Sequence, residues 1–196
     1  MAISCQKCGR QYDVTLFQYG RTINCACGAR VGFEHRLNLD PRNGLKFFAD
    51  VNVARLVRWL RAAGIDTLWE DAIADDELVR RAIEEKRFVL TLDKRLAREF
   101  LADNIILLES ENAREQFREI VARFKIKKPD RFFTRCLVCN TPLEKVESGE
   151  IAAEIPPNVL ANHDRFYFCR NCEKVFWQGS HTRRMRQQLE QMFEIG

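Results

Sequence analysis

The sequence has no run of apolar residues that approaches the roughly 18 needed to cross a bilayer. Its first residues, MAISCQKCGR, lack the cationic stretch followed by an apolar one that marks a secretory signal. No glycine-rich phosphate loop follows an apolar run, and no serine or cysteine lies in a nucleophile motif. These absences argue against membrane proteins, P-loop enzymes and serine or cysteine hydrolases, and we expect a cytoplasmic protein with no membrane partner.

What is present is the composition of a folded protein with unevenly distributed charge. With 196 residues and 46% hydrophobic content, the chain can bury a core in one or two domains. The formal net charge of +4 comes from basic flanks around an acidic middle segment, residues 41–122. A zinc site with four thiolates adds a charge of about −2. Two such sites would cancel the excess, so net charge is weak evidence for a nucleic-acid partner.

All eight cysteines occur in close pairs. The pairs are Cys5 with Cys8, Cys25 with Cys27, Cys136 with Cys139, and Cys169 with Cys172. Disulfides are the alternative, but nothing points to secretion, and close pairs hold a tetrahedral ion more readily than they bridge distant segments. We therefore predict two structural zinc ions. One lies in an N-terminal ribbon over residues 1–40, and the other in a C-terminal ribbon with a terminal helix over residues 131–196.

Residues 45–130 alternate short apolar runs with amphipathic segments. The pattern predicts strands at LKFF, IDTLW, FVLTL and NIILLE, with helical periodicity between them and after the last. Strands that are apolar throughout and separated by helices favour a parallel sheet with helices on both faces. The predicted fold class is α/β, flanked by two small zinc ribbons.

Acidic residues follow these strands at one edge of the predicted sheet. Asp50 and Asp93 come directly after KFFA and FVLTL, and Asp75 and Asp76 begin the helix after the second strand. The carboxyl ends of parallel strands face a common crevice, and carboxylates gathered there suit Mg²⁺ or Mn²⁺. Each aspartate alone is equally a helix cap. Their equivalent strand-end positions favour a catalytic metal site.

Cationic and aromatic side chains are candidates for RNA contact. Arg55, Arg58 and Arg61 recur every three residues after Asp50 and can bind phosphates, although a solvated helix face has the same pattern. The stretch FYFCRNCEKVFW interleaves aromatics with cations, which suits single-stranded RNA; packing beneath the zinc is the alternative. His181 can contact substrate or support the last helix, since four cysteines already complete the zinc site.

The order of these motifs resembles one family. The stretches FFADVNVARLVRWLRAAGIDT, DDELVRRAIEEKRFVLTLDKRLA, RCLVCN and FYFCRNCEKVFWQGSH are similar to the PIN-like RNase family named for the C-terminal domain of the mut-seven exonuclease. The family's acids fall on Asp50, on Asp75 with Asp76 as the neighbouring alternative, and on Asp93. Its pattern L-x-R-x-L-R-x-x-G-x-D falls on Leu56, Arg58, Leu60, Arg61, Gly64 and Asp66.

The resemblance implies a PIN-like nuclease fold that uses Mg²⁺ or Mn²⁺ at these aspartates to cleave RNA. The aromatic and cationic residues described above favour single-stranded RNA as the partner. Leu92 stands where the family has arginine, and Val53 and Ala54 replace leucine and glycine. A second hypothesis is therefore a non-catalytic RNA-binding or ribosome-associated zinc-ribbon adaptor. The N-terminal ribbon lies outside the resemblance, and we expect it to contact RNA, the ribosome or another protein.

Overall fold

A computed structural model describes residues 1–151 and 154–194 of the chain. The described residues form two compact units, each built from two separate stretches of sequence. The first contains Met1–Ala54 and Trp69–Glu111, and the second contains Arg55–Leu68 and the described residues from Asn112 onward. The three predicted segments do not map one to one onto these units. Residues 152–153 and 195–196 of the third segment lie outside the described part of the chain.

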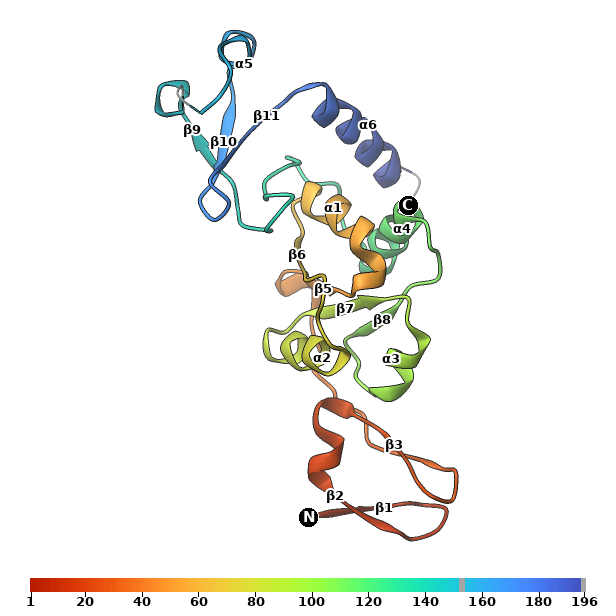
Figure 1. Ribbon diagram of the computed structural model, residues 1–196. Coiled ribbons are helices and arrows are strands. Elements are labelled where there is room, and N and C mark those ends of the chain that lie inside the picture. The colour runs from red at the N-terminus through yellow and green to blue at the C-terminus, as the bar shows by residue number, and fades with distance from the viewer. Residues whose placement is uncertain (152–153, 195–196) are drawn as a thin grey trace. The chain divides into compact units, whose positions relative to one another are not determined.

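The central sheet is parallel and has the strand order β6-β5-β7-β8 (Figure 1). The strands are β5 (Lys46–Ala49), β6 (Asp66–Trp69), β7 (Phe88–Thr91) and β8 (Ile105–Leu107). β5 pairs with β7, with Ala49 opposite Leu90, and β7 pairs with β8. Every residue of β7 is buried, so both faces of this strand are covered. The predicted α/β fold with a parallel sheet is confirmed.

The strand order contains a switch point. The chain passes from β5 to its neighbour β6 on one side and then crosses to β7 on the other. In open parallel sheets, such a reversal leaves a crevice beyond the carboxyl ends of the two flanking strands. Here the flanking strands are β5 and β7, which end shortly before Asp50 and Asp93.

Three helical segments of the first unit begin at acidic residues. Asp50 caps a short 3₁₀ segment, η3 (Val51–Val53), which leads into α1 (Ala54–Ala62). α2 (Asp75–Glu84) has acidic residues throughout its first turn and packs against β5 and β7. α3 (Lys94–Glu99) is capped by the side chain of Asp93 and lies beside β8. Acids are favoured at helix N-termini because they satisfy free N–H groups and complement the helix dipole.

The N-terminal ribbon belongs to the first unit. β1 (Ala2–Ser4) pairs with β2 (Gln11–Asp13), and β3 (Ile23–Asn24) pairs with β4 (Arg30–Val31), both antiparallel. Between the pairs lies η1 (Val14–Gly20), and η2 (Pro41–Asn43) leads towards β5. Phe17 and Val31 pack with Cys5 and Cys25 in a small core. Folds with cores of this size commonly rely on a bound metal ion.

Gly20 has no room for a side chain. Its φ is +78°, and a Cβ built on it would lie 2.4 Å from the carbonyl oxygen of Leu101. We expect Gly20→Ala to lower the free energy of unfolding by about 2 kcal/mol or more, because strain adds to a backbone clash. Gly9→Ala is the matched control: its φ is +73°, but nothing lies within 4 Å. Urea unfolding of the two variants should therefore show a clearly smaller loss for Gly9→Ala, and equal losses would contradict the expected clash.

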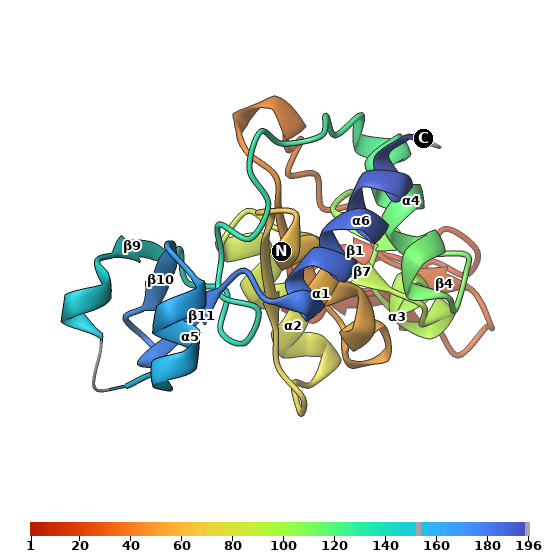
Figure 2. The same ribbon diagram turned by 90° about the horizontal axis from the view of Figure 1, so that it is seen from above.

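The second unit combines helices with an antiparallel sheet. α4 (Ala113–Phe124) packs with the terminal helix α6 (Ser180–Glu194), as Figure 2 shows. The rings of Phe117 and Phe193 meet edge to face with their centres 5.4 Å apart. The C-terminal ribbon has the strand order β11-β10-β9, followed in Figure 2 from β9 (Glu144–Val146) to β10 (Phe166–Cys169) and β11 (Lys174–Trp177). Its other segments are η4 (Ser148–Glu150) and α5 (Pro157–Asn162). None of the described helices in either unit is long and apolar enough to span a bilayer.

Candidate active site and zinc centres

The eight cysteines form the two groups of four that the sequence predicts. In the N-terminal group the Sγ atoms of Cys5 and Cys27 are 3.6 Å apart, and those of Cys8 and Cys25 are 3.5 Å apart. In the C-terminal group, formed by Cys136, Cys139, Cys169 and Cys172, the measured Sγ separations are 3.9 Å and 3.3 Å. A tetrahedral zinc site with Zn–S bonds of about 2.3 Å has sulfur atoms about 3.8 Å apart. All eight are free cysteines, so the disulfide alternative is not what the structure shows, and both groups can bind structural zinc.

Backbone turns and a phenol support the N-terminal cysteine group. The amides of Gly9 and Gly28 donate to the carbonyls of Cys5 and Cys25, and both glycines have a positive φ that closes the knuckle. A hydrogen bond with the side chain of Tyr12 is the main cause that lowers the pKa of Cys25 to about 6. The Tyr12 phenol therefore favours the thiolate form of Cys25, the form in which a cysteine binds zinc.

Asp50 lies at the carboxyl end of β5 and is almost completely buried, with 4% of its surface exposed. Its Oδ1 accepts from the Val51 amide at 2.6 Å, and its Oδ2 accepts from the side chains of Asn52 and Thr91, both at 2.6 Å. A carboxylate has about four lone-pair positions, so these three donors fix its orientation and leave capacity for another ligand.

Thr91 joins the ends of β5 and β7, a role that the sequence analysis missed. Its hydroxyl donates to Asp50 and accepts from the Asp93 amide at 2.9 Å and from the Asn52 side chain at 3.3 Å. The hydroxyl thus uses its one donor and both acceptor positions. Asn52 in turn accepts from the Leu92 amide at 3.0 Å. The sequence signal was a polar residue ending an otherwise apolar strand, two positions before Asp93.

Asp75 and Asp93 face the same region, and Arg95 of α3 connects them. The Arg95 guanidinium lies 3.2 Å from Asp75 Oδ2 and 3.8 Å from Asp93 Oδ2. Burial raises the pKa of Asp75, and the neighbouring charge of Asp50 raises it further, while Arg95 acts in the opposite direction. The carboxylates of Asp50, Asp75 and Asp93 therefore interact electrostatically. Arg95 supplies a cation three residues after Leu92, the position at which the resemblance leads one to expect an arginine.

The aspartates do not form a closed cage. Within the described part of the chain, only the two cysteine groups bring three or more possible metal ligands from histidine, cysteine, aspartate or glutamate within 4.8 Å of one another. Asp76 differs from its neighbour Asp75, because its side chain is 58% exposed and pairs with Arg21 at 2.6 Å. These contacts favour Asp75 over Asp76 as the acid that faces Asp50.

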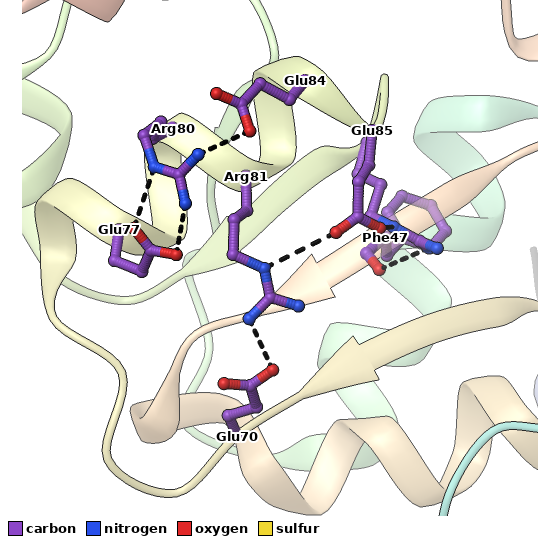
Figure 3. Close-up of polar contacts among 8 residues, drawn as sticks. Phe47, Glu70, Glu77, Arg80, Arg81, Glu84 and Glu85 are labelled. Carbon is purple, nitrogen blue, oxygen red and sulfur yellow. Dashed lines mark hydrogen bonds and ion pairs between the residues drawn. The ribbon is translucent and has the colours of Figure 1, made fainter.

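Arginines of α2 fix the helix that carries Asp75 (Figure 3). Arg81 pairs with Glu70, just after β6, at 2.6 Å, and its guanidinium lies 4.9 Å from the centre of the Phe48 ring on β5. Arg80 is held between Glu77 and Glu84 on the same helix, at 2.6 Å from each. Arg81 thus ties α2 to the sheet, while Arg80 reinforces the helix itself.

The three arginines predicted to contact RNA are not equivalent. Arg55 and Arg58 are exposed on α1, whereas Arg61 is buried with 4% exposure. Its guanidinium donates to the carbonyls of Thr67, Leu137 and Val138 at 2.9, 3.2 and 2.7 Å. Arg61 therefore joins α1 to the first knuckle of the C-terminal zinc ribbon, and only Arg55 and Arg58 remain candidates for phosphate contact. His181 lies exposed in the first turn of α6.

Residues at and just before the same knuckle also contact Gly64 and Asp66, the two positions that follow Arg61 in the family's sequence pattern. Asn140 accepts from the Thr67 amide at 3.0 Å and donates to Asp66 Oδ1 at 2.9 Å. Gly64 has φ +86°, and a Cβ there would lie 2.7 Å from Thr134 Oγ1. The spacing Arg61, Gly64, Asp66 is thus explained by contact with the ribbon.

We expect Arg61→Lys to lower the free energy of unfolding by about 2–4 kcal/mol. A lysine cannot reproduce the planar fork, so buried carbonyls lose their donors. Arg58→Lys, at an exposed position of the same helix, should change the free energy of unfolding by less than about 0.5 kcal/mol. Denaturant titration of both variants measures the difference. Equal stabilities would contradict the structural role of Arg61.

Carboxylates thus gather at the switch point of the parallel sheet, in a chain that also carries two groups of four cysteines. Residues 45–189 match the Mut7-C RNAse domain, and the chain belongs to this family. The family indicates a nuclease-like function directed at RNA. No curated protein and no solved structure matches the chain. The N-terminal ribbon lies outside the matched residues.

Proposed function

We propose that the protein is an endoribonuclease of PIN-like type that uses Mg²⁺ or Mn²⁺ held by Asp50, Asp75 and Asp93. The observation that carries this proposal is the group of carboxylates at the switch point, where buried Asp50 is fixed by three hydrogen bonds and partly exposed Asp75 and Asp93 share the guanidinium of Arg95. The hydrogen bonds from Asn52 and Thr91 satisfy the buried carboxylate and fix its direction, while one lone-pair position is left for a metal ion.

An open group of carboxylates fits these ions. Mg²⁺ keeps several waters and is bound through one or two carboxylates together with substrate phosphates. A bound ion of this kind activates a water and neutralises the phosphodiester during in-line displacement. In this chain, Thr91 and Asn52 orient Asp50, and the α3 cap positions Asp93. Arg95 balances the charge of Asp75 and Asp93 and is 70% exposed, so it can also reach a phosphate.

The C-terminal ribbon supports a single-stranded substrate. An open groove of about 880 Å³ is lined by the aromatic side chains of Phe168, Phe176 and Trp177 and by the cations Arg170 and Lys174, together with Glu154 and Glu173. Aromatic faces stack on unpaired bases and cations bind the backbone. Arg55 and Arg58 of α1 and His181 of α6 are further candidates for RNA contact.

The test is cleavage of a circular single-stranded RNA by zinc-loaded protein, with Mn²⁺ added or omitted. A circle has no ends, so its linearisation reports an endonuclease, and a fully paired RNA of equal length is the structural control. Mn²⁺ is omitted rather than removed with a strong chelator, because a chelator would also remove zinc from the ribbons. The zinc content is measured in both conditions to show that the ribbons stay loaded. Linearisation that depends on Mn²⁺ supports the proposal. Binding without cutting in every condition would instead support the RNA-binding adaptor.

A further inference from the structure

The N-terminal ribbon is attached to the rest of the first unit by backbone hydrogen bonds at the end of α3. The Thr22 amide donates to Glu99, the Leu101 amide donates to Gly20, and the His35 amide donates to Leu101, all at 2.7 Å. The close approach of Gly20 to Leu101 lies in the same contact. The ribbon and α3 therefore share one extended attachment within a single compact unit.

This attachment brings ribbon arginines to the elements that carry the acids. The Arg30 side chain donates to the Arg98 carbonyl, in the last turn of α3, at 3.0 Å. Arg21 pairs with Asp76, next to Asp75, and its guanidinium lies 6.0 Å from the centre of the Phe100 ring. Arg21 and Arg95, from separate segments, thus contact adjacent residues in the first turn of α2.

α3 continues this arrangement with cations of its own. Lys94 and Arg98 are four residues apart, and Arg95 and Arg98 are three apart, so their side chains are neighbours on the helix surface. The combined set is exposed and is called here the ribbon–α3 surface: Arg21, Arg30, Lys94, Arg95 and Arg98.

The ribbon–α3 surface has more positive than negative charge. Asp76 pairs with Arg21, and Glu99 lies 3.9 Å from Arg95. No ion pair with Arg30, Lys94 or Arg98 occurs among residues 1–151 and 154–194. Arg30, Lys94 and Arg98 are therefore exposed cations without a carboxylate partner, and two of them lie on the helix that Asp93 caps.

We propose that the ribbon–α3 surface binds phosphates of the RNA strand next to the acidic site, which makes the N-terminal ribbon a substrate-binding part of the nuclease. The identity of the partner as RNA rests on the proposed function. Arginine forks match phosphate oxygens, and contacts of this kind position a strand without reading its sequence. The surface thus complements the acidic site: the acids act at one phosphodiester while the cations hold its neighbours.

Salt dependence of binding tests the proposal. The probe is a fluorescent single-stranded oligoribonucleotide, and the parent is the full chain with Asp50→Asn, which keeps the probe intact. For a single strand, each phosphate contact contributes about 0.7 to the steepness with which the logarithm of the association constant falls with the logarithm of the salt concentration. Arg30→Ala combined with Arg98→Ala should therefore lower the slope by about 1.4 and weaken binding roughly 25-fold at 0.1 M salt. Arg30→Lys combined with Arg98→Lys should retain most of the slope.

The matched control removes the same charge elsewhere in the first unit. Arg36 and Arg42 are exposed and pair with Glu34 and Asp40, so their double alanine variant should bind like the parent. Thermal unfolding establishes that each variant is folded. An Arg30/Arg98 variant with the parent's slope and affinity would overturn the proposal, as would a parent that does not bind the probe.

Cleavage provides a separate measurement. With an otherwise unchanged chain, the Arg30/Arg98 alanine variant should show a raised KM for RNA and an unchanged kcat. If the unmutated protein cuts no RNA under any metal condition, the proposed nuclease activity fails, while the binding measurement still decides whether this surface binds RNA.

Discussion

Asp93→Asn should reduce Mn²⁺-dependent RNA cleavage on the order of 10³-fold or more while leaving the fold intact. The Asp93 side chain caps α3 by accepting from the Arg95 amide at 2.6 Å, and asparagine caps a helix about as well as aspartate. We therefore expect the free energy of unfolding to change by less than about 0.5 kcal/mol. Initial cleavage rates and urea unfolding on the same preparations measure the two effects.

Asp76→Asn is the control for that substitution. Asp76 is an acid at the start of a neighbouring helix, but it is largely exposed and pairs with Arg21 outside the proposed metal-binding set. Its replacement should change the rate at saturating RNA by no more than about threefold, since exposed ion pairs contribute little. An Asp93→Asn enzyme with a rate near that of Asp76→Asn would remove Asp93 from the proposed active site.

Asp50 is a less clean position for the same test. Three donors converge on its carboxylate, and an asparagine would place an amide N–H₂ group among them. We expect a loss of activity as large as that of Asp93→Asn, accompanied by about 1–3 kcal/mol of destabilisation. This loss of stability does not prevent a binding measurement with a folded variant, but it complicates the interpretation of cleavage rates.

The second large effect is expected at the C-terminal zinc site. Cys136→Ser should abolish cooperative folding of the second unit, because structural zinc contributes on the order of 10 kcal/mol and Cys136 itself is fully buried. The loss should extend to α1, since the carbonyls of Leu137 and Val138 are acceptors for Arg61. Amide hydrogen exchange over residues 55–68 and zinc content per chain are the measurements.

Cys8→Ser provides the comparison within the other cysteine group. Cys8 is exposed and belongs to the first unit. Both substitutions should lower zinc content, but Cys8→Ser should leave exchange over residues 55–68 at the level of the unmutated chain. Faster exchange there in both variants, or in neither, would show that the C-terminal knuckle does not support α1 in this way.

Much of the architecture could be predicted because its signals are local. Apolar runs of strand length, the positions of capping acids and the spacing of cysteines each record a short-range constraint, and they located the sheet strands and both cysteine groups. The location of Asp50 and Asp93 at one sheet edge followed from parallel topology alone. The proposed catalytic roles of these acids still require the experiments above.

Side-chain direction and tertiary partners were harder to predict. Arg55, Arg58 and Arg61 share a spacing of three, but with 3.6 residues per turn each step falls short of a full turn by about 60°. Over two steps the row rotates by about 120°, which carries Arg61 from the exposed face to the buried one. Thr91 and Asn52 were missed because their partners lie about 40 residues away in the sequence. The attachment of the N-terminal ribbon to α3 has no local signal at all.

The contacts of the C-terminal knuckle limit how the chain can be divided. Two of the three carbonyls that accept from buried Arg61 lie on the knuckle, and so does the Asn140 side chain that meets Thr67 and Asp66. A chain cut after residue 130 would leave that guanidinium without these acceptors. The C-terminal ribbon is therefore not an interchangeable module. In recombination between relatives, it would have to be inherited together with the segment from Arg61 to Thr67.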